Sequence, residues 1–305
     1  VGVELLLQAL PISTSTQTGY HVHPNILTNP PHHRWTMATG WDLRDVQHMH
    51  ANNHGFAAEH DFQRDSHAIG LVGDSYVEAA MLPMAQRPAA QLERALGGQR
   101  PVYAMGGPGS SLLDYAERIR WAHETFGRRD CEVRMESSDA SQALCDSGTV
   151  HARCLAPERL TPVVQRRAPS GPLKELLRQS ALAQYLVSQL KFSGERLTSP
   201  DFWRSGAPDA HVRRVVAIDM NRRNLQAGVR RPDEGYHVEQ RLRAAGYPVV
   251  RGEPLYRAHQ RQSPLRLDMG PHDGHLNAIG VRLLMTAAAK AVPEQPVIDI
   301  TDRGN

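Results

Sequence analysis

The sequence lacks several features that would place it in common classes of protein. Its 305 residues contain no apolar run of the roughly 20 residues that a membrane-spanning helix needs. They contain 3 cysteines and no paired C-x-x-C motif, which argues against a structural zinc site. The 35 basic and 32 acidic residues leave a net charge of only +3, too small an excess to indicate nucleic-acid binding. With 40% hydrophobic and 22% charged residues, the composition is that of an ordinary folded protein.

A group of histidines near the N-terminus is the other pattern that could suggest a metal. His21, His23, His32 and His33 lie in a segment rich in Pro, Thr and Asn. No acidic residue accompanies them at ligand spacing, and scattered histidines of this kind are more often surface or hydrogen-bonded groups. We therefore expect no metal site.

Strands and helices alternate regularly from residue 67 onward. Apolar stretches predict strands at 67–72, 102–105, 131–135, 214–218 and 247–250. Helices are expected at 77–96, 112–126, 237–245 and 277–292. This alternation indicates a parallel sheet with helices on both faces, that is, a three-layer α/β/α sandwich. Open sheets of this type have their sites at the carboxyl ends of the strands.

Two segments fall outside this alternation. Residues 1–66 are expected to form an irregular N-terminal wrap. Between about 137 and 210 the alternation stops for too long to be a plain loop, so we expect an insertion within the domain 67–305. Leucines at helical spacing predict an amphipathic helix over 172–192. Its simplest role is to pack on the core, and the alternative is a lid or a partner-binding helix.

The cysteines and the first residues bear on the compartment of the protein. Cys145 and Cys154 bracket a short segment that a disulfide could close in an oxidising compartment. Cys131 begins a predicted core strand and is expected to be a buried thiol. The first ten residues, VGVELLLQAL, are apolar and begin without Met, which would suit a chain trimmed after a signal or membrane anchor. An ordinary first helix or a processed N-terminus is an equal alternative.

A serine follows the first predicted strand of the core at a position suited to catalysis. Gly73, Asp74 and Ser75 form a turn between this strand and the next helix. Such a turn exposes the serine hydroxyl at the sheet edge and directs helix N-terminal N–H groups at an oxyanion formed there. A serine hydroxyl still needs a histidine base, and usually a carboxylate that orients the base. The alternative is that Asp74 and Ser75 only cap the helix.

The other end of the chain supplies both of these groups. Asp273 and His275 stand immediately before the last predicted helix, and Asn277 follows them. Alone, this segment could be a turn with a cap. Together, a G-D-S after the first strand and a D-x-H before the final helix make a much more specific pattern. We therefore predict a catalytic triad of Ser75, Asp273 and His275.

At these residues the sequence resembles the SGNH/GDSL hydrolases, over about residues 68–292 and with the long insertion unmatched. Within that family it is most similar to the branch that includes bacterial polysaccharide O-acetylation proteins. The resemblance implies a flavodoxin-like fold in which Ser75 is the nucleophile and His275 is the general base and later the acid. Asp273 then fixes the His275 tautomer and stabilises its imidazolium form.

The resemblance also implies an oxyanion hole, which this sequence matches only in part. The backbone N–H groups of Ser75 and Gly109 correspond to two of its donors. The family usually has an Asn at the end of the third strand, where this chain has Glu136, Ser137, Ser138 and Asp139. Ser138 takes the Asn position, and losing one such donor costs on the order of 3 kcal/mol. We expect a weakened hole or one completed by another residue. Separately, the segment Asp219-Met220-Asn221 after the fourth strand is a candidate accessory part of the site, and a plain turn is the alternative.

For function, the resemblance implies a cofactor-free serine esterase or acyltransferase that forms an acyl-serine intermediate. The expected substrate is a small acyl ester, such as acetyl, on a carbohydrate outside the cytoplasm of a bacterial cell, either in the periplasm or facing outward from a membrane anchor. One alternative is a non-catalytic carbohydrate-binding or scaffold protein with the same fold. Another is a lipase or thioesterase, because the sequence does not define the acyl length.

Overall fold

The computed structural model of the protein describes residues 2–14, 17–39, 42–128, 130–136, 139–145, 153–156, 158–159, 161–164, 177–191, 213–219, 234–270 and 273–292. The helices are α1 (Gly2–Ala9), α2 (Ser75–Glu78), η1 (Met84–Gln86), α3 (Pro88–Ala95), α4 (Leu112–Phe126), α5 (Asp139–Gln142), α7 (Ala181–Lys191), α9 (Glu234–Ala244), α10 (Gly252–Gln262) and α11 (Ala278–Ala291). The strands are β1 (Gly19–His23), β2 (Ile26–Thr28), β3 (Arg34–Thr39), β4 (Arg44–His50), β5 (Ile69–Val72), β6 (Val102–Met105), β7 (Asp130–Glu136), β8 (Arg153–Leu155), β9 (Pro162–Val164), β10 (Arg213–Asp219) and β11 (Val249–Arg251).

Five of these strands form the central sheet, in the order β11-β10-β7-β5-β6. All neighbouring pairs are parallel. The first strand of the sheet in sequence, β5, therefore lies between the second, β6, and the third, β7. This is the flavodoxin-like strand order, in which the connections leave in opposite directions from neighbouring strands and open a crevice at their carboxyl ends. The ends of β5 and β7 are thus the expected place for a site.

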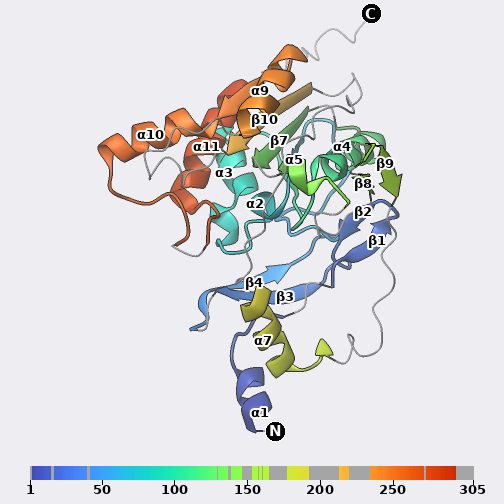
Figure 1. The fold of residues 1–305 in the computed structure, drawn as a ribbon, viewed down its shortest axis with the longest axis vertical. Coiled ribbons are helices and arrows are strands. Elements are labelled where there is room, and N and C mark those ends of the chain that lie inside the picture. The colour runs from blue at the N-terminus through green and yellow to red at the C-terminus, as the bar shows by residue number, and fades with distance from the viewer. Residues whose placement is uncertain are drawn as a thin grey trace, which may run out of the picture.

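Helices cover the sheet on both faces (Figure 1). On one face α11 packs against α3 and α10 and contacts β10 and β11. On the other face α4 packs against β5, because right-handed crossovers place α3 and α4 on opposite sides when the chain reverses its direction across the sheet. Covered from both sides, β5 and β6 are buried at every residue. The predicted three-layer α/β/α sandwich with a central parallel sheet is confirmed.

The helix predicted over 77–96 is wrong as a single element. The helix α2 ends after one turn, at Ala79, whose φ of 44° and ψ of 51° place it in the left-handed region. A 3-10 turn η1 follows Pro83, and α3 then begins with Pro88 at its first position. Proline cannot donate a helical hydrogen bond but is well suited to a helix start, so the two prolines divide the segment.

Residues 2–66 contain more regular structure than the sequence indicated. β1 pairs with β2 and β3 with β4, each as an antiparallel two-stranded sheet. Trp35 and Met49 pack together from β3 and β4. The helix α1 lies beside α7 at the end of the molecule farthest from the central sheet (Figure 1). The division of the chain at residue 66 stays a prediction.

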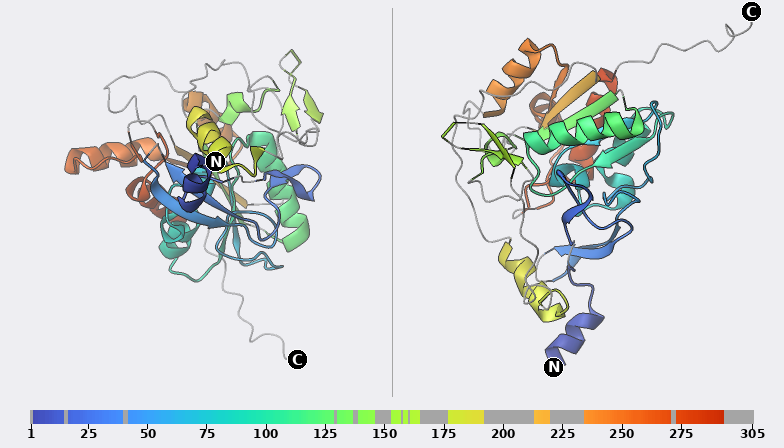
Figure 2. Two further views of the ribbon diagram at one scale, coloured as in Figure 1. Left: turned by 90° about the horizontal axis from the view of Figure 1, so that it is seen from below. Right: turned by 90° about the vertical axis from the view of Figure 1, so that its right-hand side faces the viewer.

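The helix predicted over 172–192 is described only in its later part, as α7. It packs against α1, with Leu7, Ile12 and Ala181 buried between them, and not against the central core as the simplest interpretation expected. The right-hand view of Figure 2 shows the same pair, again apart from the sheet. Among the described residues, no helix has the length and apolar character that crossing a membrane requires.

Candidate active site

Ser75, His275 and Asp273 form a hydrogen-bonded chain at the carboxyl end of β5. His275 Nε2 lies 3.0 Å from Ser75 Oγ, and His275 Nδ1 lies 2.6 Å from Asp273 Oδ1. Asp273 Oδ1 also accepts the backbone N–H of His275 at 2.9 Å. With the Nδ1 proton held by the carboxylate, Nε2 is left to accept the proton of the serine hydroxyl. The His275 and Asp273 side chains are 26% and 17% exposed, so solvent reaches this chain of side chains.

The turn between β5 and α2 holds Ser75 in place. Asp74 is the N-cap of α2, and its Oδ1 accepts the N–H of Tyr76 at 2.9 Å. Its backbone carbonyl accepts the N–H groups of Val77 and Glu78, both at 3.2 Å. Asp74 therefore does cap the helix, as the alternative interpretation of the motif expected. This cap fixes the first turn of α2 and with it the position of the Ser75 hydroxyl.

The loop that carries His275 is held by the cap of the next helix. Asn277 Oδ1 accepts the N–H groups of Ile279 and Gly280 at 3.0 and 3.1 Å, at the start of α11. Asn277 Nδ2 donates to the carbonyls of Arg266 and Asp268 at 2.8 and 3.2 Å. One amide side chain thus joins α11 to the preceding loop and limits the movement of His275 relative to the sheet.

The glycine-rich turn after β6 lies directly against α2. A Cβ atom on Gly106 would stand 2.5 Å from the backbone nitrogen of Glu78, so only glycine fits at this close approach. Gly109, the predicted oxyanion donor, lies in the same turn with a φ of 71°. The structure therefore brings the glycine block next to the segment that carries Ser75.

Arg118 is a buried residue of this site that the sequence analysis missed. From α4 it donates to the carbonyls of Gly73 and Met105, at 2.8 and 3.1 Å, and to Ser110 Oγ at 2.7 Å. It therefore joins the end of β5, the end of β6 and the glycine turn. A signal was present, because the helical spacing that buries Tyr115 and Ile119 also places Arg118 on the buried face of α4.

The end of β7 provides the third side of the site. Ser137 and Ser138 lie outside the described residues, so the place of Ser138 in the oxyanion hole stays a prediction. Glu136 accepts a hydrogen bond from the Tyr76 hydroxyl at 2.8 Å, and its N–H donates to Asp139 Oδ2 at 2.9 Å. The candidate accessory residue Asp219 is bound instead to Arg134, at 2.9 Å, with both side chains 1% exposed.

Several carboxyl groups lie buried around the serine. Burial raises the pKa of Asp74, and the positive charges of Arg134 and His275 only partly oppose this effect. Burial also raises the pKa of Glu78 to about 7, against the influence of Arg87 and His275. The surroundings of the serine are therefore less negative at neutral pH than their residue types suggest.

Two of the three cysteines are paired, and the third is a free thiol. Cys145 and Cys154 are joined by a disulfide. Cys131 is a buried free thiol, and burial raises its pKa to about 12, which makes it unreactive. Within the described ranges, no three His, Cys, Asp or Glu residues are grouped so as to hold a metal ion.

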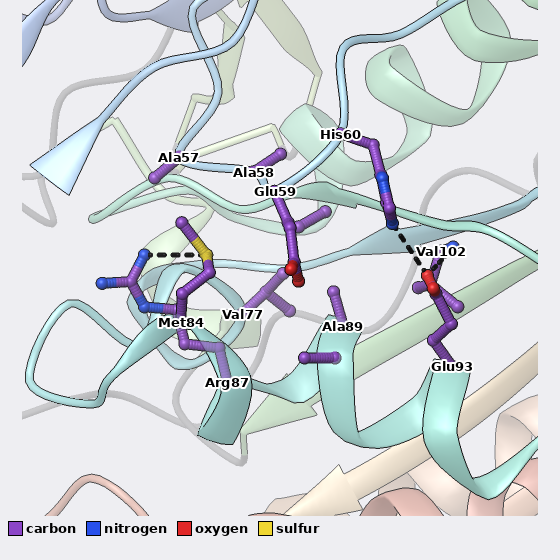
Figure 3. A pocket seen from close by; sticks show the side chains of 12 residues that line it. Ala57, Ala58, Glu59, His60, Val77, Met84, Arg87, Ala89, Glu93 and Val102 are labelled. Carbon is purple, nitrogen blue, oxygen red and sulfur yellow. Dashed lines mark hydrogen bonds and ion pairs between the residues drawn. The ribbon is translucent and has the colours of Figure 1, made fainter. Parts of the chain in front are cut away.

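A pocket is lined by residues of α3, η1, β6 and the segment before β5, together with Val77 of α2 (Figure 3). Its lining includes none of Ser75, His275 and Asp273. His60 Nε2 lies 3.0 Å from Glu93 Oε2, which also accepts the N–H of Val102 at 2.9 Å. Arg87 donates to Met84 Sδ at 3.4 Å.

No protein-family model matches the chain, and a search of curated proteins found no match. Solved structures do resemble it. A member of the lipolytic G-D-S-L family from Veillonella parvula is 11% identical over 73% of this chain and 96% of its own, with a TM-score of 0.40. A carbohydrate acetylesterase from Sinorhizobium meliloti is 12% identical over 73% and 96%, with a TM-score of 0.35. The chain is thus similar to proteins described as a G-D-S-L lipolytic protein and a carbohydrate acetylesterase.

Proposed function

We propose that the protein is a serine ester hydrolase of the SGNH type, with Ser75, His275 and Asp273 as its catalytic triad. The observation that supports this most is the continuous hydrogen bonding from Ser75 Oγ through His275 to Asp273, at 3.0 and 2.6 Å. A nucleophile within reach of a base, and a base oriented by a carboxylate, is the arrangement that serine acyl transfer requires.

In the proposed reaction Ser75 Oγ attacks the ester carbonyl while its proton passes to His275 Nε2. Asp273 holds the Nδ1 proton and stabilises the imidazolium. The N–H groups of Ser75 and Gly109 donate to the oxyanion of the tetrahedral intermediate, with Ser138 as the third donor in our proposal. His275 then returns the proton to the leaving alcohol, and an acyl-serine remains. Water attacks this acyl-serine with His275 again as base, which releases the acid and restores Ser75.

The proposed substrate is a small acyl ester, such as acetyl, on a carbohydrate. Support for this comes from the resemblance of the Gly73-to-Ser75 and Asp273-to-Asn277 segments to polysaccharide O-acetylation proteins. In the acyltransferase form of the proposal, a sugar hydroxyl takes the place of water in the second step. We also propose an extracytoplasmic location, which the Cys145–Cys154 disulfide supports. The exposed leucines of α1 are compatible with attachment to a membrane at that end.

A fluorophosphonate probe and p-nitrophenyl acetate test the proposal together. We expect the protein to be labelled and to hydrolyse the ester, and Ser75→Ala to abolish both while the melting temperature stays the same. His275→Ala should reduce labelling and hydrolysis nearly as much as Ser75→Ala does. The double variant should hydrolyse the ester hardly more slowly than either single variant, because the two residues act as a unit. Ser263→Ala is the matched control, because Ser263 lies at the end of α10 and is not part of the site.

The alternatives give different results in the same assay. Absence of labelling in the unmodified protein contradicts the proposal and favours a binding or scaffold protein with this fold. Labelling that persists in Ser75→Ala places the reactive nucleophile elsewhere. A series of p-nitrophenyl esters with increasing acyl length separates an acetylesterase from a lipase, since only the lipase improves with the longer chains.

A further inference from the structure

Tyr76, the residue after the proposed nucleophile, lies directly against the proposed base. The centroids of the Tyr76 and His275 rings are 4.4 Å apart, and the ring planes are inclined by 34°. Both side chains are partly buried, at the carboxyl end of β5. The ring contact is additional to the hydrogen bonds that hold His275 through Asp273.

The hydroxyl of Tyr76 is fixed at two points. It donates to Glu136 Oε1 at 2.8 Å, and it lies 3.4 Å from the carbonyl oxygen of Gly274, the residue before His275. Tyr76 therefore connects three segments of the site, namely α2, the end of β7 and the loop that carries the base. A tyrosine held in this way restricts both the position and the tilt of the imidazole.

We propose that Tyr76 is a positioning residue for His275, whose ring aligns the imidazole with Ser75 and stabilises the imidazolium formed when it takes the serine proton. The inference rests on the proposed function. A cation over an aromatic ring is attracted by the electrons of the ring face. The hydrogen bond from the Tyr76 hydroxyl to the Glu136 carboxylate shifts electron density toward the ring and strengthens this attraction.

Other ionisable groups lie on the elements that pack around Tyr76 and His275. They are Asp273 in the loop of His275, Asp74 and Glu78 at the start and end of α2, Glu136 and Arg134 on β7, and Asp219 on β10. The Arg134 guanidinium lies 4.5 Å from the Tyr76 ring centroid and would oppose a second cation there. Its charge is balanced by Asp219 at 2.9 Å, which leaves the ring able to attract the imidazolium.

The test is the rate of fluorophosphonate labelling of Ser75, measured from pH 4 to pH 9 in the full-length protein. For Tyr76→Leu we expect the acid limb of the profile to move to lower pH by roughly half a unit to one unit, because the imidazolium loses its ring contact. The plateau rate should fall about tenfold, because the imidazole is less well aligned. Tyr76→Phe keeps the ring, so it should recover most of the plateau and show a smaller displacement in the same direction.

Tyr247→Leu is the matched control. Tyr247 also contacts an arginine, accepting a hydrogen bond from Arg214 at 2.8 Å, but it precedes β11 at the opposite edge of the sheet. It should lower the melting temperature and leave the acid limb in place. An acid limb that stays in place in Tyr76→Leu overturns the inference even if the plateau falls, since packing alone would do that.

Two further outcomes are decisive. If Tyr76→Leu does not fold, Tyr76→Met, which also removes the ring, decides, and an unchanged acid limb in that variant overturns the inference. If the unmodified protein is not labelled at all, the proposed function fails and this inference fails with it. That result differs from a labelled protein whose pH profile does not change when Tyr76 is replaced, which contradicts only the inference about Tyr76.

Discussion

At the scale of single residues, the central strand β7 carries a row of charged side chains on one face. Asp130, Glu132, Arg134 and Glu136 alternate with apolar residues along it. Three of them have ion-pair or hydrogen-bond partners in Arg100, Asp219 and Tyr76. Neither carboxyl oxygen of Glu132 has a hydrogen-bond partner in the part of the chain that the structure describes. Burial raises the pKa of Glu132 to about 8, so Glu132 stays protonated in the folded protein at neutral pH.

This gives a pH dependence of stability with a defined sign. Between the ordinary value of 4.5 and about 8, the folded protein keeps a proton on Glu132 that the unfolded chain has lost. The free energy of unfolding therefore falls as the pH rises through this window. Glu132→Gln removes the effect, so we expect it to be more stable than the unmodified protein by about 2 to 4 kcal/mol at pH 8. At pH 5 the difference should be close to zero.

Urea unfolding at pH 5 and pH 8 measures both values. Glu158→Gln, at an exposed glutamate between β8 and β9, should show no such difference. A stabilisation by Glu132→Gln that is equal at the two pH values would mean that Glu132 is ionised, or protonated, equally in the folded and unfolded chains.

At the scale of elements, the Cys145–Cys154 disulfide holds the segment that follows β7. It joins residues 9 positions apart and connects the turn that follows α5 to β8. The segment begins with Asp139, which binds the N–H of Glu136 at 2.9 Å and accepts from Tyr115 at 3.0 Å. The disulfide therefore limits the freedom of the chain beside the proposed oxyanion hole.

Removing this disulfide should reduce stability more than activity. Cys145→Ala with Cys154→Ala should lower the free energy of unfolding by roughly 2–3 kcal/mol, the loop-closure entropy of a short loop. Urea unfolding of oxidised and reduced protein checks the value, and Cys131→Ala is the control for the loss of a cysteine. Mass spectrometry that finds both thiols free in protein from an oxidising compartment would contradict the pairing and the proposed location.

The accuracy of the sequence predictions differs between elements for physical reasons. The strand β6 and the helix α4 have the predicted bounds, because β6 is a short apolar run that glycines follow, and α4 combines a helical period with a capping box and a glycine at its end. The strands β1, β3 and β4 were not predicted, because they are largely polar and only partly buried, and β2 was not, because it has only three residues. The broken helix after Ser75 could have been predicted from Pro83 and Pro88.

The residues of the site also divide into those that the sequence indicates and those that it does not. That Ser75, Asp273 and His275 lie together could be predicted because their two motifs are specific and lie next to predicted strand and helix ends. The roles of Tyr76 and Glu136 had no such signal, since no spacing in a single sequence shows that a ring on α2 meets an imidazole 199 positions later. Contacts between distant segments come from tertiary packing, which the periodicity of single elements does not encode.

At the scale of the whole molecule, one side chain, Glu4, joins α1 to α7 by hydrogen bonds at the end farthest from the sheet. Glu4 on α1 accepts the N–H groups of Ala181 and Leu182 at the start of α7, at 2.8 and 2.9 Å, and the Ser180 hydroxyl at 3.0 Å. These backbone hydrogen bonds lower the pKa of Glu4 from 4.5 to about 2. The cap is therefore complete above pH 4.5 and is lost as the pH falls toward 2.

We expect Glu4→Gln to loosen α7 without affecting ester hydrolysis. The amides of Ala181 and Leu182 should exchange faster with deuterium, because a neutral amide is a weaker acceptor than a carboxylate. Hydrogen exchange of the peptide that contains them, at pH 3 and pH 7, measures the change. Glu124→Gln, at an exposed glutamate on α4, is the control, and equal exchange in both variants would show that Glu4 does not hold α7.

The hydrogen bond between Ser75 and His275 joins residues 200 positions apart, near the two ends of the core. Ribosomes make the chain from its N-terminus, so Ser75 leaves them long before His275 has been made. Until α11 has been made and has packed against α3, Ser75 is an ordinary alcohol. A nascent chain, or one that ends before residue 275, therefore lacks the base that the proposed reaction requires, and the proposed hydrolysis can begin only once His275 has been made and has folded against Ser75.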